Sequence, residues 1–314
     1  MTRQHTADSA LGRATFEPMG DMALDPTSPT LLVTSGKQLL AFDVSDPRTL
    51  APRVVFESDR PLEKLAVSPD GQRIAVSTYF DVSLLDATGA RVGTLALAQT
   101  AQMVFVADGT LMAERRNGDV NVASPDGTIR QLERKPGTIE GFALSVTPDG
   151  TWAASSTDSH VRLYEVAKGT QFKRLVTTRA CRHAFSPDGL TLVHAAKDHS
   201  GLVVLGVGKK WPTLDTVALP PWPGMTSRVT VHEIGFSPDG SRLWCTQHDV
   251  GYTARVSVWD WPARTMLHAI DLPATGDKRP WPRFTVSDGR HAFVAMHRHN
   301  GGAGDHELLS FDVS

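Results

Sequence analysis

The chain has 314 residues, of which 40% are hydrophobic and 21% are charged, and its formal net charge at pH 7 is -2. This length allows one large closed domain, and the composition is typical of a globular protein. It argues against a disordered chain and against a strongly basic protein that binds nucleic acid.

The first residues, MTRQHTADSALGRATFEP, lack the apolar stretch that a secretory signal peptide needs. No later segment approaches the roughly 20 apolar residues of a spanning helix. We therefore expect a cytoplasmic protein that does not bind membranes. The two cysteines, Cys181 and Cys245, lie in apolar runs without metal-ligand spacing, so we expect buried free thiols.

A short turn motif then recurs along the chain. SPDG occurs at residues 68–71, 124–127, 186–189 and 237–240, and the related VADG, TPDG and VSDG end at Gly109, Gly150 and Gly289. With a DP turn at residues 25–28, and with the copy at 124–127 set aside, seven turns follow one another at intervals of 38 to 51 residues. Seven units of this period predict a repeat protein.

Each turn separates two short β-rich runs, such as HEIGFSPDG and SRLWCTQ. A third run and a fourth follow, as in VSVWDWPA and MLHAIDL, and none shows helical periodicity. Four short strands per repeat predict one blade of a β-propeller. The expected fold is therefore all-β, a single domain over residues 1–314 with seven four-stranded antiparallel blades.

The chain resembles the WD-repeat type of seven-bladed β-propeller over nearly its whole length. The best stretch is SVTPDGTWAASSTDSHVRLYEVAKG at residues 145–169, and the dipeptide that names the family occurs once, as Trp259-Asp260. The Gly-His pair that opens typical repeats is missing, so the family's Asp/His/Ser/Trp hydrogen-bond network is not expected. The resemblance implies a stand-alone bacterial binding propeller.

The last repeat ends at Ser314 after three strands, whereas the strand-like piece ALGRATFEP precedes the first repeat. An open ring would expose a sheet edge. We therefore expect residues at about 10–18 to complete the last blade and close the ring.

The DG turns have a structural explanation. Proline presets φ at the second position, aspartate favours the third, and glycine adopts the left-handed conformation at the fourth. In antiparallel blades these turns all lie on one face of the disc, here called the bottom, where their carboxylates are too far apart to act together.

The loops on the opposite face, here called the top, are longest in the last three repeats. They span residues 195–202, 246–255 and 297–307, and the links between blades there span 219–228 and 272–283. Long loops on a rigid scaffold commonly carry function. The sequence therefore predicts a binding site at the top of blades 5 to 7.

Aromatic and arginine residues, which anchor protein interfaces, are frequent in these loops. The predicted partner-binding residues are Trp222, Arg228, His248, Tyr252, Arg255, Lys278, Arg279, Trp281, Arg283, His297, Arg298 and His299. Alternatively, the tryptophans cover the cores of their own blades. The histidines lack a recognised ligand spacing, so we expect solvated or partner-contacting side chains and no metal. The basic top predicts a protein partner with an acidic contact surface.

A second candidate site lies at the mouth of the central channel. Its predicted residues are Glu63, Lys64, Gln102, Arg182, His183, His232 and Glu233. Such a mouth could bind a small molecule, or its charges could pair with one another. Similar propellers include sugar-lactone hydrolases, which implies an enzymatic alternative, but the sequence contains no GxSxG, HExxH or phosphate-binding loop.

The predicted function is accordingly a non-enzymatic protein-binding platform without a cofactor. It would serve as a scaffold, or as an inhibitor such as an immunity protein for a cognate bacterial effector. Nucleic acid is not an expected partner, because the basic clusters and stacking platforms of the usual nucleic-acid-binding folds are absent.

Overall fold

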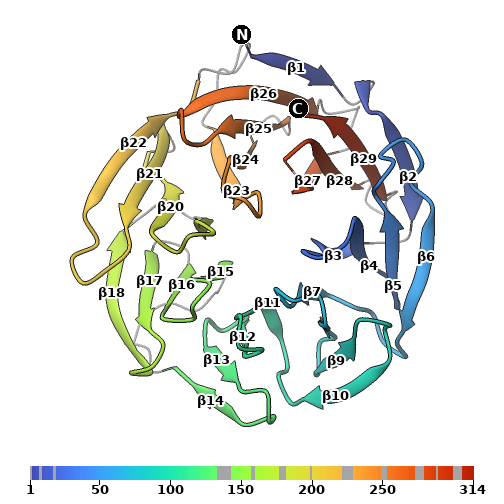
Figure 1. The fold of residues 1–314 in the computed structure, drawn as a ribbon, viewed down its shortest axis with the longest axis vertical. Helices are drawn as coiled ribbons and strands as arrows, with labels where there is room; N and C mark the ends of the chain where they lie inside the picture. The colour runs from blue at the N-terminus through green and yellow to red at the C-terminus, as the bar shows by residue number, and fades with distance from the viewer. Residues whose placement is uncertain are drawn as a thin grey trace.

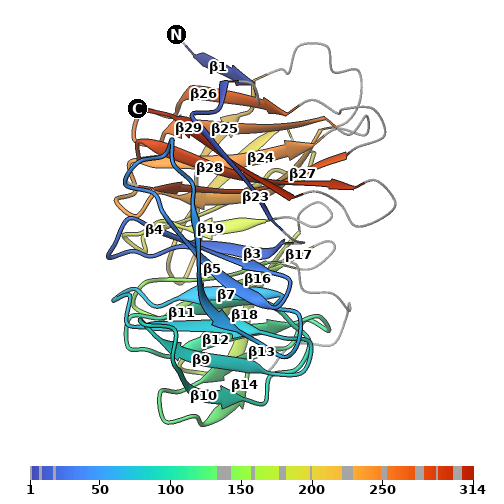
Figure 2. The same ribbon diagram turned by 90° about the vertical axis from the view of Figure 1, so that its right-hand side faces the viewer.

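In a computed structural model, the strands of the chain form seven sheets arranged in a ring around a central axis (Figure 1). The structure describes residues 2–6, 9–16, 19–132, 143–156, 160–176, 182–198, 200–220, 229–248, 253–272, 279–287, 289–299 and 306–314. Within these ranges, no helix is long and apolar enough to cross a membrane. Figure 2 shows the same disc edge-on.

Blades 1 to 4 follow one another along the chain, each as a four-stranded antiparallel sheet. Blade 1 contains β3 (Met19–Leu24), β4 (Thr30–Ser35), β5 (Gln38–Asp43) and β6 (Pro52–Glu57). Blade 2 contains β7 (Lys64–Val67), β8 (Arg73–Ser77), β9 (Val82–Asp86) and β10 (Arg91–Leu95). Blade 3 contains β11 (Thr100–Phe105), β12 (Leu111–Arg115), β13 (Val120–Ala123) and β14 (Ile129–Gln131). Blade 4 contains β15 (Ala143–Val146), β16 (Trp152–Ser156), β17 (His160–Glu165) and β18 (Thr170–Val176).

Blades 5 to 7 complete the ring. Blade 5 contains β19 (His183–Phe185), β20 (Thr191–Ala195), β21 (Gly201–Gly206) and β22 (Thr213–Ala218). Blade 6 contains β23 (Thr230–Phe236), β24 (Arg242–His248), β25 (Ala254–Asp260) and β26 (Thr265–Leu272). Blade 7 contains β27 (Arg279–Ser287), β28 (His291–His299) and β29 (His306–Asp312), to which the N-terminal β2 (Gly12–Phe16) adds the outer strand.

The predicted ring closure is confirmed. Strand β2 pairs antiparallel with β29, from Gly12 opposite Ser310 to Phe16 opposite His306. One element was not predicted: β1 (Arg3–Thr6) pairs in parallel with β26 and makes blade 6 a five-stranded sheet. The N-terminal segment therefore lies along the outer edges of two neighbouring blades.

The hydrophobic core consists of seven clusters, and each of them is shared by two neighbouring blades. Between blades 7 and 1, for example, Phe293 and Leu308 pack with Leu31 and Phe42, and Ala14 of the closing strand packs against the same cluster. No blade buries its two faces by itself, so the stability of each blade depends on its neighbours.

The DG turns join the first strand of a blade to the second, as the turn at Asp188 does in blade 5, except that the copy at 124–127 joins β13 to β14. The Ser186 hydroxyl donates to the Asp188 carboxylate at 2.5 Å, and that carboxylate accepts the Leu190 N–H at 2.9 Å. The hydrogen bond from Ser186 holds the pKa of Asp188 below its usual range. Gly189 has a φ of 70°. The structural explanation of the motif is therefore confirmed, and the serine proves to be part of it.

Replacing Gly189 by valine is expected to lower the free energy of unfolding by roughly 1–3 kcal/mol, because a β-branched residue is strained at this φ. Urea denaturation measures the loss. Gly93→Val is the matched control, because Gly93 lies in the outer strand β10 and its added Cβ would approach no atom closer than 3.8 Å. Equal midpoints for Gly189→Val and the wild type would contradict the assignment.

Candidate functional site

An aromatic patch lies on the top face over blades 2 and 3, here defined as Arg60, Tyr79, Phe80, Gln99 and Arg116. Tyr79 and Phe80 form the tip of the turn between β8 and β9, and they are 43% and 57% exposed. Their ring centroids are 5.2 Å apart. The Arg60 guanidinium lies 4.4 Å from the Phe80 ring centroid, and that of Arg116 lies 5.8 Å from the Tyr79 ring centroid. The patch therefore combines exposed rings with cations.

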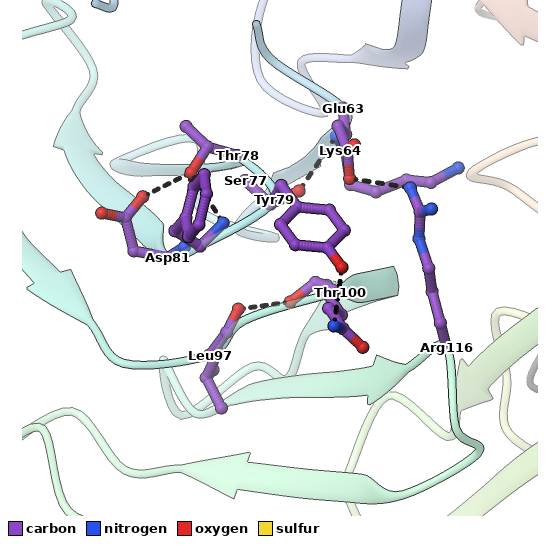
Figure 3. Close-up of polar contacts among 11 residues, drawn as sticks. Glu63, Lys64, Ser77, Thr78, Tyr79, Asp81, Leu97, Thr100 and Arg116 are labelled. Atoms are coloured by element: carbon purple, nitrogen blue, oxygen red, sulfur yellow. Dashed lines mark hydrogen bonds and ion pairs between the residues drawn. The ribbon is translucent and has the colours of Figure 1, made fainter. Parts of the chain in front are cut away.

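The patch is held in place by hydrogen bonds from three loops (Figure 3). The Thr78 hydroxyl donates to the Asp81 carboxylate at 2.7 Å, which closes the turn that carries both rings. The Gln99 amide donates to the Tyr79 hydroxyl at 2.8 Å, and Arg116 donates to Glu63 at 3.0 Å. Gln99 has a φ of 57°, a strained value for a residue other than glycine. A surface fixed in this way loses little entropy when it binds a partner.

The second candidate site is a cavity of about 230 Å³ in the upper part of the channel, here called the channel cavity. Its polar lining comes from Asp21, Gln102, Arg182, His183 and Glu233, and its apolar lining from Met22, Ala143, Leu144, Ile234 and Trp244. Nine of these residues lie in the first or second strand of a blade, and Arg182 directly precedes the first strand of blade 5. Together they come from five different blades. The site thus exists only in the closed ring.

Trp244 reaches the cavity because its neighbour on β23 is a glycine. Gly235 lies opposite Trp244 in the pairing of β23 with β24. A Cβ at Gly235 would stand 2.2 Å from the Cζ2 atom of Trp244. Any side chain there would displace the indole ring, so this glycine determines the shape of the cavity wall.

His183 is the most buried polar group of the lining, with 4% of its surface exposed. Its Nδ1 lies 2.8 Å from the Ser145 hydroxyl, whereas its buried Nε2 has no hydrogen-bond partner among the described residues. Burial, reinforced by His194 and Arg182, lowers the pKa of His183 to about 3. The ring is therefore neutral at pH 7.

A buried carboxyl lies between blades 3 and 4. Glu114 on β12 is fully buried and accepts a short hydrogen bond from the Ser155 hydroxyl on β16. Burial raises the pKa of Glu114 to about 8, although Ser155, Arg182 and Arg162 act in the opposite direction. The side chain is thus protonated at neutral pH, which reduces the cost of burying it.

Comparisons with known proteins agree with this architecture. The family "WD domain, G-beta repeat" (WD40) matches residues 136–165, which end in the third strand of blade 4. The chain is a WD-repeat-like seven-bladed β-propeller. A solved structure, that of the Kuenenia stuttgartiensis hydrazine synthase, is similar to the propeller with a TM-score of 0.66 and 14% sequence identity, over 91% of this chain and 96% of the other. At this identity the likeness concerns the fold alone. No curated protein matches the sequence.

Among the predicted partner-binding residues of the propeller, Trp222, Arg228, Tyr252 and Lys278 lie outside the described residues. Six others lie in strands and not in loops, which corrects the expected loop limits. They are Arg279, Trp281 and Arg283 in β27, and His297, Arg298 and His299 in β28. Trp281 is opposite His297, and Arg279 is opposite His299. The backbone therefore brings these two groups together at the top of blade 7.

The two prolines of RPWPR, Pro280 and Pro282, explain why this segment was expected to be a link between blades. Proline is tolerated at an edge strand, where alternate N–H groups need no partner within the sheet. β27 pairs with β28 alone in the sheet of blade 7, and the prolines are two residues apart, so both nitrogens share one side of the strand. The strand therefore continues through both prolines.

Two predicted contact residues are buried, and the prediction is corrected for them. His248 on β24 is 8% exposed, its ring centroid lies 4.4 Å from that of His232, and burial lowers its pKa to about 4. The guanidinium of Arg255 donates to both carboxylate oxygens of Asp271, at 2.7 and 3.0 Å. The ladder between β24 and β25 continues to the pair of His248 with Ala254, beyond the loop limit expected from the sequence. Both side chains therefore contribute to the packing of blade 6.

Of the seven residues predicted at the channel mouth, four line the channel cavity: Gln102, Arg182, His183 and Glu233. The other three are not part of its lining. Glu63 instead pairs with Arg116 beside the aromatic patch, and the Lys64 N–H donates to the Ser77 hydroxyl. The ring of His232 packs against that of His248.

Cys245 is a buried free thiol, as predicted. Its sulfur lies 3.0 Å from the Ser257 hydroxyl, and burial raises its pKa to about 11. Cys181 lies outside the described residues. In the part of the propeller that the structure describes, no group of three or more His, Cys, Asp or Glu residues is placed to hold a metal ion.

The aromatic patch was not predicted from the sequence, because the prediction rested on loop length and the turn that carries Tyr79 and Phe80 is short. A signal was present: two adjacent aromatic residues stand between two apolar strands, in VSTYFDVS. Large apolar side chains at the tip of a tight turn have no core to enter.

Proposed function

We propose that this propeller is a non-enzymatic protein-binding platform of the cytoplasm and that its top face is the binding surface. The aromatic patch carries the proposal. Tyr79 and Phe80 are large apolar side chains that are exposed in the protein alone, and Arg60 and Arg116 lie over their rings. Aromatic and arginine residues are enriched among those that dominate binding energies.

The binding surface extends, in this proposal, across the top face to blades 5 to 7. There it includes Trp222, Arg228, Tyr252, Lys278, Arg279, Trp281, Arg283, His297, Arg298 and His299. Seven of these residues carry cationic or ionisable basic groups, and in this proposal they share the top face with the patch arginines, Arg60 and Arg116. A partner with an acidic contact surface complements them, and its association rate would fall as salt screens the charges.

Two modes of action are compatible with such a platform. As a scaffold, the propeller would leave the activity of its partner unchanged. As an inhibitor, such as an immunity protein for a cognate bacterial effector, it would cover the active surface of that partner. An assay of the purified partner with and without the propeller separates the two modes.

The double variant Tyr79→Ala/Phe80→Ala is expected to bind the partner at least roughly 30-fold more weakly, the effect of losing about 2 kcal/mol at an interface centre. A photo-crosslinking residue at Phe80, Trp222 or Trp281 would first capture the partner in cells for identification by mass spectrometry. Isothermal titration with the purified partner then measures the loss. Reversal of Arg279, Arg283 and Arg298 to glutamate is expected to slow association.

Leu190 provides the matched control. It is 66% exposed and follows a DG turn, so it lies on the bottom face. The same crosslinker at Leu190 should capture no partner, and Leu190→Ala should bind normally. Capture through Leu190 alone, or normal binding by both the aromatic double variant and the arginine reversal, would refute the proposed surface.

A further inference from the structure

The channel cavity lies inside the ring, and nothing in the proposed function uses it. It collects basic, acidic and apolar groups from five blades into about 230 Å³. We propose that it binds a small zwitterion of the α-amino-acid type. This inference does not depend on the protein-binding platform and concerns a separate site.

Arg182, His183 and Gln102 form the part of the lining suited to a carboxylate. The guanidinium offers several donors in a planar fork that matches two carboxylate oxygens. Gln102 adds an amide N–H from blade 3, and the neutral His183 ring donates its Nε2–H in the tautomer whose Nδ1 accepts from the Ser145 hydroxyl. One ligand carboxylate can thus accept hydrogen bonds from blades 3 and 5.

The orphan nitrogen of His183 is the strongest sign that a ligand belongs here. Its Nδ1 is already engaged with Ser145, and its Nε2 is buried without a hydrogen-bond partner among the described residues. A buried polar atom that makes no hydrogen bond destabilises the folded protein. A polar ligand in the cavity that His183 lines would satisfy this atom.

Asp21 and Glu233 form the part of the lining suited to an ammonium group. Glu233 belongs to blade 6 and Arg182 directly precedes the first strand of the neighbouring blade 5, so the lining offers groups of opposite charge from adjacent blades. Asp21 adds a second carboxylate from blade 1. The carboxylate of Asp21 is oriented by the Met22 N–H at 3.1 Å and the Leu65 N–H at 3.4 Å.

The size and the apolar lining narrow the ligand class. The cavity is smaller than the roughly 300–1,000 Å³ of pockets for drug-sized molecules. Leu144, Ile234 and Trp244 provide apolar surface in the same lining, where an apolar side chain of the ligand can pack. A free amino acid with an apolar side chain fits these three features together.

The test uses the full-length protein and the twenty common L-amino acids as probes. At least one apolar amino acid is expected to raise the melting temperature and to bind with 1:1 stoichiometry in isothermal titration. Its analogues that lack either the amino group or the carboxylate are expected to bind at least tenfold more weakly. If no amino acid binds, or if the deaminated analogue binds as well as the parent, the zwitterion site is refuted.

Single substitutions in the lining test whether the amino acid binds in the channel cavity. Asp21→Asn and Glu233→Gln should weaken the binding of the amino acid and leave the binding of its deaminated analogue unchanged. Arg182→Gln should weaken the binding of both compounds. Arg53→Gln and Glu57→Gln, on the exposed outer strand β6, are the matched controls. Wild-type affinity in all three cavity variants would overturn the assignment. The analogue series on the wild-type protein remains decisive if a cavity variant does not fold.

Discussion

A chain that begins at Met19 is expected to unfold at a much lower denaturant concentration than the full chain. The truncation removes the five residue pairs between β2 and β29 and the ion pair of Arg13 with Glu307. It also removes Ala14 from the cluster between blades 7 and 1. At about 1 kcal/mol net for each backbone hydrogen bond, the loss should be roughly 3 kcal/mol or more.

Urea denaturation and light scattering measure the two consequences of this truncation. The exposed edge of β29 should promote association between chains, because an unpaired strand is a template for another strand. A chain that begins at Ser9 is the control, since it loses β1 but keeps β2. If the chain beginning at Met19 were as stable as the full chain, ring closure by β2 would not contribute to stability.

The free energy of unfolding is expected to be highest near pH 6.5 and to fall on both sides. The pKa of Glu114 is about 8 in the folded protein against an ordinary value of 4.5, so the folded state keeps a proton that the unfolded state has lost. The contribution of Glu114 to the free energy of unfolding therefore falls by about 1.4 kcal/mol per pH unit as the pH rises from 4.5 to about 8.

The acid side is governed by the buried histidines. The pKa values of His183 and His248 are about 3 and about 4, below the ordinary 6.5, so the unfolded state binds protons that the folded state does not. Stability therefore falls as the pH drops from 6.5 toward these values. Between pH 4.5 and pH 6.5 both effects operate. There the stability lost on acidification through the two histidines exceeds the stability gained through the one glutamate, so the maximum lies near pH 6.5.

Glu114→Gln tests this prediction, because the amide cannot ionise. Relative to the wild type, the variant should gain about 1.4 kcal/mol per pH unit between pH 5 and pH 8. Below about pH 4.5 the two proteins should show the same pH dependence, because Glu114 is protonated there in both the folded and the unfolded state. Denaturation curves at several pH values measure both limbs, with Glu57→Gln on the exposed β6 as the control for loss of a carboxylate. A parallel pH dependence in Glu114→Gln and the wild type would contradict the assignment of the alkaline limb.

The fold could be predicted from the sequence because each blade carries its own turn chemistry. The spacing of the DG turns was sufficient to count the blades, and the missing fourth strand of the last repeat led to β2. β1 could not be found in this way. RQHT has no apolar alternation, and its pairing with β26 is made by the backbone.

The sites were less predictable, because they depend on side-chain direction. Glu63 and Lys64 were expected at the channel mouth with Gln102, yet only Gln102 lines the cavity. Successive residues of a strand face opposite sides, so a shift of one position moves a side chain out of the channel. Glu114 gave no signal in the sequence, since its burial depends on packing between blades 3 and 4.

The N-terminal segment has a consequence for the order in which the protein folds. β2 precedes the first strand of blade 1, but its partner β29 is the last strand of the propeller, with Arg13 and Glu307 separated by 294 positions. Contacts of such long range form slowly, because the loop that they close costs conformational entropy. On the ribosome, blades 1 to 6 can assemble progressively, whereas blade 7 must wait until β29 has been synthesised. Closure of the ring by β2 therefore follows the assembly of the other blades.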